Sequence, residues 1–306
     1  MRWRGRRQSS NVVDKRGSRM PRMARLGAGG GGIMRLLPLV FRVLGFKGTL
    51  IAIVLVVGYS YFSGDLQRFL GDGGMASSQP GSTNQPVKQS EAEKQLVEFV
   101  STVLADTEDS WNELFRQAGQ SYREPRLVLF REAVATACGT GSAQIGPFYC
   151  PADQKVYLDL SFFDELQRRH GAPGDFAQAY VIAHEIGHHV QTLAGISAKV
   201  HKAKQSLSQV EANRLSVKQE LQADCYAGIW AHDARRSRQV LEAGDIEEGL
   251  AAASAIGDDR LQKQARGYVT PDSFTHGSSE QRVAWFKKGL SEGTLKACDT
   301  FAAGAL

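Results

Sequence analysis

Residues 184–188 read H-E-x-x-H, and they hold the side chains of this chain that are best suited to chemistry. On a helix, positions four apart share a face, so His184 and His188 can direct two imidazole nitrogens at one zinc ion. Glu185 follows the first histidine and can take a proton from a water molecule that the metal activates. The preceding residues 176–183 are mostly apolar, which favours a buried helix over one whose His and Glu simply face solvent.

A catalytic zinc ion usually has three protein ligands and one open position. One known spacing places a third histidine six residues after the second motif histidine, but that position holds Ala194, and the glycine it requires is replaced by Gln191. His189 would point about 100° away from His188 on a helix, which favours a packing role. The third ligand must therefore come from another segment.

A second helix-like segment, residues 215–230, offers that ligand. Glu220 and Asp224 are four residues apart in it and share a face. Glu220 would complete a His-His-Glu site for one Zn²⁺ per domain, and Asp224 could accept a hydrogen bond from the far nitrogen of a ligand histidine. The alternative is an exposed acidic pair on a helix surface. Downstream of H-E-x-x-H, the E-x-x-x-D pattern favours the zinc site.

The order H-E-x-x-H then E-x-x-x-D resembles the gluzincin arrangement of the HtpX/Ste24-type membrane-associated metallopeptidases. From about Phe99 to the C-terminus, the chain resembles more closely the bacterial putative neutral zinc metallopeptidases, the YpfJ-like proteins. The motifs that carry this resemblance are, in order, Cys138-Gly139-Thr140, Gly146-Pro147-Phe148-Tyr149-Cys150-Pro151, Ala183-His184-Glu185-Ile186-Gly187-His188-His189, Glu220-Leu221-Gln222-Ala223-Asp224-Cys225, Gly244-Asp245-Ile246-Glu247 and Ser273-Phe274-Thr275-His276-Gly277. The resemblance implies a zincin-like fold that acts on peptides or proteins, and it specifies no particular substrate.

Residues 275–283 resemble the C-terminal His…Glu-Arg segment of the HtpX-type enzymes, from which a residue lies near the active site. By this resemblance, a His or Arg of this segment would stabilise the oxyanion of a tetrahedral intermediate, and His276 would be a second catalytic residue beside Glu185. The alternative is that Ser278 and Ser279 cap a helix and that His276 is only a loop residue.

The net charge of +5 combines two opposite parts. Residues 1–47 hold 12 Lys/Arg and one acid, a charge of +11, and the other residues hold 25 Lys/Arg and 31 Asp/Glu, a charge of −6. An uncharged run of 17 residues at 48–64 predicts a transmembrane helix at the short end of the usual range. The positive-inside rule places the basic tail in the cytoplasm. We therefore expect a single-pass protein of the inner (cytoplasmic) membrane, anchored by one N-terminal span, with an extracytoplasmic domain.

A cleaved signal peptide is the alternative to this anchor, but its basic region would be unusually long, and no clear cleavage site follows the run. Nucleic-acid binding by the basic tail is also conceivable, but most of the tail lacks interleaved aromatic residues, so we expect no nucleic-acid partner. Residues 65–90 include a stretch rich in Gly, Ser, Gln and Pro and are expected to form a flexible linker. Residues 91–306 are then long enough for one metallopeptidase domain.

Four cysteines lie after the linker, namely Cys138, Cys150, Cys225 and Cys298. An even number in an oxidising compartment favours disulfides, and three pairings are possible. We favour Cys138–Cys150, which closes a short glycine-rich loop, with Cys225–Cys298, which joins the Glu220 segment to the C-terminal region. Four buried thiols are the alternative, and a four-cysteine zinc site is disfavoured because C-x-x-C is absent.

The apolar patterns predict an α+β, mostly helical fold. Helices are expected at 91–116, 175–193, 209–233, 246–255 and 279–290, and short strands at 126–130 and 155–160. The strands would form a small sheet with an exposed edge, to which an extended peptide could add.

These patterns together predict a membrane-anchored zinc metalloendopeptidase. The alternative is a non-catalytic, zinc-containing, membrane-tethered binding or assembly module. Glu185 argues against this alternative, because a purely structural zinc site needs no general base.

Overall fold

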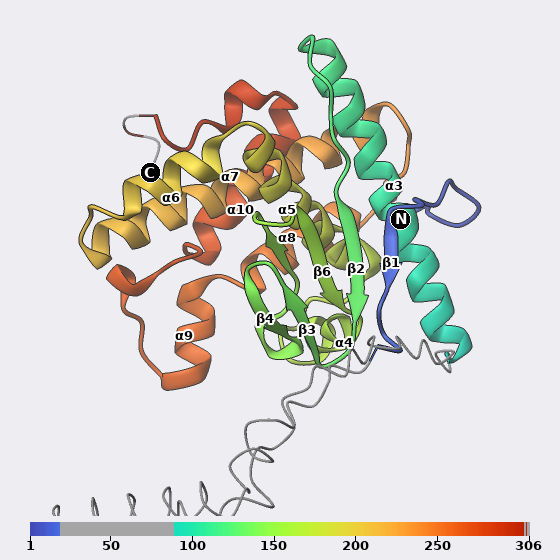
Figure 1. Ribbon diagram of the computed structural model, residues 1–306, viewed down its shortest axis with the longest axis horizontal. Helices are drawn as coiled ribbons and strands as arrows, with labels where there is room; N and C mark the ends of the chain where they lie inside the picture. The colour runs from blue at the N-terminus through green and yellow to red at the C-terminus, as the bar shows by residue number, and fades with distance from the viewer. Residues whose placement is uncertain (19–88, 303, 305–306) are drawn as a thin grey trace, which may run out of the picture. The chain divides into compact units, whose positions relative to one another are not determined.

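The computed structural model of the chain describes residues 1–18, 89–302 and 304. This part is mostly helical and contains small sheets (Figure 1). The strands are β1 (Val12–Asp14), β2 (Arg126–Phe130), β3 (Ala133–Thr136), β4 (Gly139–Ser142), β5 (Phe148–Cys150) and β6 (Lys155–Asp159). The α-helices are α3 (Glu91–Gln117), α4 (Ser161–Arg168), α5 (Asp175–Leu193), α6 (Ile196–Lys204), α7 (Gln209–Arg236), α8 (Asp245–Ala255), α9 (Asp258–Arg266) and α10 (Ser279–Glu292).

The larger sheet has the strand order β1-β2-β6-β5. β1, β2 and β6 are parallel to one another, and β5 is antiparallel to β6 at the edge. Both faces of the sheet are covered: Leu127 and Leu158 pack into the main helical core, while Val128 and Tyr157 belong to a second cluster with Phe148. This explains why β6 is buried almost throughout.

Helix α5 occupies the centre of the helical part. It packs against α3, α7 and α8 and touches β5 and β6. Its sequence is apolar on nearly every side, as expected for a helix that is surrounded by other elements. Phe176 stacks on Trp230 of α7 with ring centroids 5.5 Å apart. The residues 184–188 are therefore held by a rigid support, which a catalytic site requires.

Two disulfides are present, and they are the favoured ones. Cys138 is bonded to Cys150 of β5, with a Cα–Cα distance of 5.8 Å. Cys225 of α7 is bonded to Cys298, with a Cα–Cα distance of 5.6 Å. The second bond fixes the C-terminal region to the helix that carries Glu220.

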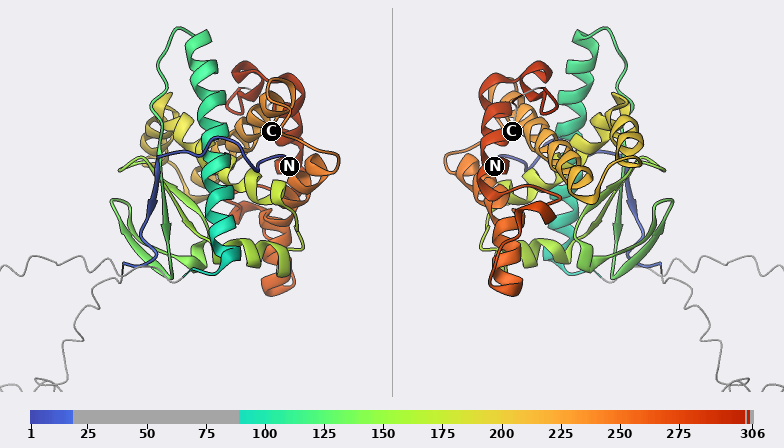
Figure 2. Two further views of the ribbon diagram at one scale, coloured as in Figure 1. Left: turned by 90° about the vertical axis from the view of Figure 1, so that its right-hand side faces the viewer. Right: turned by 90° about the vertical axis from the view of Figure 1, so that its left-hand side faces the viewer.

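The N-terminal residues Met1–Gly17 belong to the same compact unit as the helices. β1 adds to the sheet beside β2, and this segment lies alongside α3 (Figure 2). Its basic side chains pair with acids of α3: Arg7 lies 3.0 Å from Glu108, and Arg16 lies 2.8 Å from Glu93. The opposite charges of the two parts of the chain therefore attract each other within one folded unit.

This packing corrects the predicted membrane topology. A cytoplasmic tail at 1–47 and an extracytoplasmic domain at 91–306 would lie on opposite sides of a membrane, whereas the first 17 residues pack directly on the domain. No helix in the described ranges is long and apolar enough to cross a membrane, and the segment 48–64 and most of the linker 65–90 lie outside those ranges. The predictions of a single-pass anchor and of an inner-membrane location were wrong because the basic residues, which suggested a positive-inside signal, partly serve as ion-pair partners of the domain.

Candidate active site

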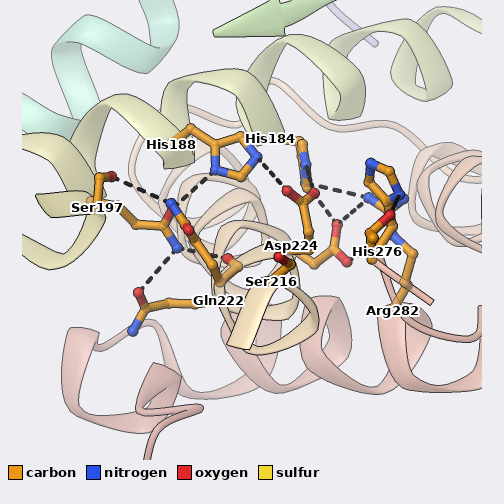
Figure 3. A network of polar contacts seen from close by, with 12 residues as sticks. His184, His188, Ser197, Ser216, Gln222, Asp224, His276 and Arg282 are labelled. Atoms are coloured by element: carbon orange, nitrogen blue, oxygen red, sulfur yellow. Dashed lines mark hydrogen bonds and ion pairs between the residues drawn. The ribbon is translucent and has the colours of Figure 1, made fainter. Parts of the chain in front are cut away.

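Helices α5 and α7 bring three ligand-type side chains together. His184 and His188 project from α5, and Glu220 projects from α7 (Figure 3 shows the histidines). Gly187 lies where the helices cross: a Cβ atom there would meet the carbonyl oxygen of Ala223 at 2.9 Å and its Cα at 3.1 Å. Glycine therefore permits an approach of the two helices that no larger residue would allow without a shift of the backbone.

The three side chains have the spacing of a metal site. Nε2 of His184 lies 3.2 Å from Oε2 of Glu220, and Nε2 of His188 lies 3.5 Å from Oε1. All three donor groups lie within 4.8 Å of one another. Tetrahedral zinc, with donors about 2 Å from the metal, holds its donor atoms roughly 3.3 Å apart. These residues could therefore hold a zinc ion with little rearrangement.

The far nitrogen of His184 is fixed by a buried polar network. Nδ1 lies 2.8 Å from Asp224, which also accepts a hydrogen bond from the Tyr180 hydroxyl. Arg282 donates two hydrogen bonds of 2.9 Å to the same carboxylate (Figure 3). Because a carboxylate can only accept, Nδ1 carries a proton, and Nε2 is the nitrogen that is left to bind a metal. Burial alone would raise the pKa of Asp224, but the charge of Arg282 and the contact with His184 lower it to about 2.

A neutral network fixes His188 in the same way. Its Nδ1 lies 2.9 Å from the side-chain oxygen of Gln191. The Gln191 amide donates to the carbonyl oxygen of Gln219 at 2.7 Å and to the side chain of Gln222 at 3.0 Å. Since the amide nitrogen is committed to these acceptors, the amide oxygen faces His188 and selects its Nδ1–H tautomer. Nε2 of His188 is thereby directed at Glu220.

The donor set requires a cation. If both histidines are neutral, two imidazole lone pairs and a carboxylate face one another at short range, which is repulsive. Burial alone would lower the pKa of His184, but the carboxylates of Asp224 and Glu220 raise it to about 10. Burial would likewise raise the pKa of Glu220, but His188 and His184 hold it well below its usual value. A proton fills this need in the metal-free chain, and a divalent metal would fill it better.

Glu185 lies beside this triad and faces a cavity of about 650 Å³. It is 7% exposed, and burial raises the pKa of its carboxyl group. A carboxylate with a raised pKa is a better general base near neutral pH. The cavity is also lined by His184, His188 and Glu220, so base and triad open onto the same space.

His276 lines the same cavity, and among the described residues it forms no hydrogen bond or ion pair with the triad. Its Nδ1 lies 3.3 Å from Asp258, the first residue of α9. The other oxygen of Asp258 accepts the backbone N–H groups of residues 275–277. The hydrogen bond with Asp258 raises the pKa of His276, which favours the imidazolium form, in which Nε2 also carries a proton and can donate. Ser278 caps α10, so the expected helix cap and a His276 that faces the cavity occur together.

The structure also contains functional candidates that the motifs did not reveal. Tyr180 could have been found from its position one turn before His184 on the same helix face. Gln191 lies three residues after His188 on the same helix, so their contact is local. Arg282 and Asp258 meet their partners only through the fold. His189, expected to pack, is fully buried, lies 2.6 Å from the carbonyl oxygen of Arg123, and has a pKa lowered by burial to about 4.

Comparison with protein families agrees with this geometry. A model of the family described as "putative neutral zinc metallopeptidase" matches residues 1–301. The chain therefore belongs to this family. The match includes the N-terminal segment that packs on the helices.

Individual relatives extend over similar lengths. The uncharacterized protein YpfJ of Escherichia coli (strain K12) is 49% identical over 303 residues, which cover 98% of this chain and 99% of that protein. The uncharacterized protein Rv2575 of Mycobacterium tuberculosis (strain H37Rv) is 39% identical over 250 residues, which cover 76% of this chain and 84% of that protein. No solved structure matches the chain. The similarity to HtpX/Ste24-type enzymes that the motifs suggested is not among these findings.

Proposed function

We propose that this protein hydrolyses peptide bonds with one zinc ion held by His184, His188 and Glu220. The single observation that carries the proposal is the convergence of three metal-binding groups and a buried carboxylate on one cavity. Zinc, when bound, would polarise the substrate carbonyl and lower the pKa of water. The family description is consistent with this activity.

Glu185 acts first as general base and then as general acid. It accepts a proton from the attacking water and afterwards gives that proton to the leaving amine, so the proton count balances over the reaction. Its raised pKa favours both steps, because the carboxyl group must be able to hold the proton between them.

His276, oriented by Asp258, stabilises the negative charge that develops on the oxyanion during the reaction. Asp258 orients the imidazole through Nδ1, and Nε2–H then donates to the oxyanion at the mouth of the cavity. Arg282 acts further back: it neutralises Asp224, which orients His184, so it is a positioning residue.

The test is hydrolysis of a mixed peptide library by the full chain loaded with zinc. We expect cleavage that stops when a chelator removes the metal and returns when zinc is added back. Zinc-loaded protein that cleaves no peptide in the library would contradict the proposal.

A further inference from the structure

The cavity runs along α5, and its two ends differ chemically. One end is mostly apolar: it is lined by Val181, Phe162, Ile256 and Leu261, together with the ion pair of Arg169 and Glu165. The other lies beyond the C-terminal end of α5 and is polar. Its lining residues from α6 and α7 are Ser197, Lys204, Ser216 and Gln219. In Figure 3, Ser197 lies on the side of His188, and His276 and Arg282 lie on the side of His184.

Lys204 brings a positive charge to the polar end. Its ammonium group donates a 2.6 Å hydrogen bond to the hydroxyl of Ser216. Among the described residues, no carboxylate forms an ion pair with it, whereas Arg169 at the apolar end is paired with Glu165 at 3.7 Å. α6 carries two further lysines, Lys199 and Lys202, and no acid. The polar end therefore presents a positive charge that the described part of the chain does not neutralise.

The role of Glu185 sets the direction of a bound peptide. The leaving amine must lie next to Glu185, because that carboxyl group protonates it. Val181 is four residues before Glu185 on α5 and shares its face, so the residue after the cleaved bond enters the apolar end. The residues before the cleaved bond then extend towards α6 and α7.

We infer that Lys204 selects peptide substrates with an acidic side chain on the amino side of the cleaved bond. This inference rests on the proposed function, because Glu185 defines the direction of the peptide. An acidic side chain would replace water around the lysine ammonium while the apolar end holds the residue after the cleaved bond. A basic side chain at the same place would be repelled by Lys204.

The experiment measures binding separately from cleavage. Matched fluorescent peptides carry one Phe and, one to four residues before it, Glu, Gln or Lys. Their dissociation constants are measured by anisotropy with the zinc-loaded full chain carrying Glu185→Gln, which keeps the peptides intact. We expect Glu to bind about three- to tenfold more tightly than Lys for at least one position before Phe, a preference that weakens with added salt. Glu placed after Phe should bring no such gain.

Variants of α6 then test the residue itself. Lys204→Met should abolish the preference, Lys204→Arg should retain it, and the exposed Lys202→Ala should leave it unchanged. Equal binding of the Glu and Lys peptides, or a preference that persists in Lys204→Met, would overturn the inference. Wild-type protein that shows the preference but cleaves none of the peptides would instead refute the proposed peptidase activity and leave the binding inference standing.

Discussion

Two clusters that include residues of α5 resemble each other in the close spacing of three ligand-type side chains and differ in what balances their charge. Near the end of the helix, His184, His188 and Glu220 face a cavity. At its beginning, Asp175 approaches Asp245 and Glu248 within the same 4.8 Å limit. Both clusters have the donor groups of a cation site.

The chain supplies its own cation to the second cluster. The ammonium group of Met1 is fully buried, 2.8 Å from Asp175 and 3.2 Å from Asp245. Glu248 is also occupied, because it accepts the backbone N–H of Phe176. The described residues offer no such cation to the pair of Nε2 atoms at the other cluster. Closely spaced carboxylates alone, as in the second cluster, are therefore weak support for a metal site. The first cluster gives stronger support, because its histidines are oriented by hydrogen bonds, it faces a cavity, and the described residues place no ammonium or guanidinium group between its ligand atoms.

The largest effect is expected for Glu185→Gln. An amide cannot accept the proton of water, so we expect kcat to fall about 10²–10⁴-fold while zinc content stays the same. Glu247→Gln makes the same chemical change at an exposed position near the second cluster and should keep full activity. Activity of Glu185→Gln within threefold of wild type would exclude Glu185 as the base.

Removing the charge of Arg282, which pairs with Asp224 next to the first cluster, should lower the stability of the protein. Arg282 is 2% exposed and pairs with Asp224, which is fully buried. Arg282→Met leaves that carboxylate without its main partner, so we expect the free energy of unfolding to fall by about 3–5 kcal/mol in urea denaturation. The double variant with Asp224→Asn should recover part of this loss. A loss below about 1 kcal/mol in the single variant would mean that the network does not need the charge.

A smaller loss is expected from the second cluster. Asp245→Asn replaces the ion pair with the Met1 ammonium group by a hydrogen bond to an uncharged acceptor, so unfolding should become easier by about 1.5–3 kcal/mol. Differential urea denaturation measures this. Unchanged stability would show that the Met1 ammonium group is not held by this carboxylate in solution.

The smallest expected effect is that the stability difference between wild type and Asp245→Asn changes with pH. Burial alone would lower the pKa of the Met1 amine, but hydrogen bonds and charges from Asp175 and Asp245 raise it above 8.0. A raised pKa means that the contribution is fully present below pH 8 and is lost as the pH rises through the folded-state value. The stability difference between wild type and Asp245→Asn should therefore shrink above pH 8. A difference that grows with pH in this range would reverse the assignment.

Sequence patterns located the triad because its geometry is local. His184 and His188 are one turn apart, and the apolar residues around them fixed the helix at 175–193, where α5 is found. Glu220 could be predicted because the E-x-x-x-D spacing also follows a helix turn. The elements that carry these residues were therefore accessible from periodicity alone.

Arg282 and Asp258 could not be predicted as supporting residues, because their partners come from other parts of the chain. Gln191 is only three residues from His188, but its position was considered only as one that lacks an expected glycine. Short strands such as β4, with the sequence Gly-Thr-Gly-Ser, have little apolar alternation to reveal them. The basic N-terminal residues were misread because a count of charges does not tell attraction to a membrane surface from attraction to an acidic helix.

The central claim concerns which of the two clusters binds metal, and zinc content per chain tests it most directly. Wild-type protein, Glu220→Ala and Asp245→Asn are dialysed against the same zinc buffer and analysed by atomic absorption. We expect one zinc per chain in wild type and in Asp245→Asn, and loss of tightly bound zinc in Glu220→Ala. Stoichiometric, tight zinc in Glu220→Ala, or its loss in Asp245→Asn alone, would contradict the account.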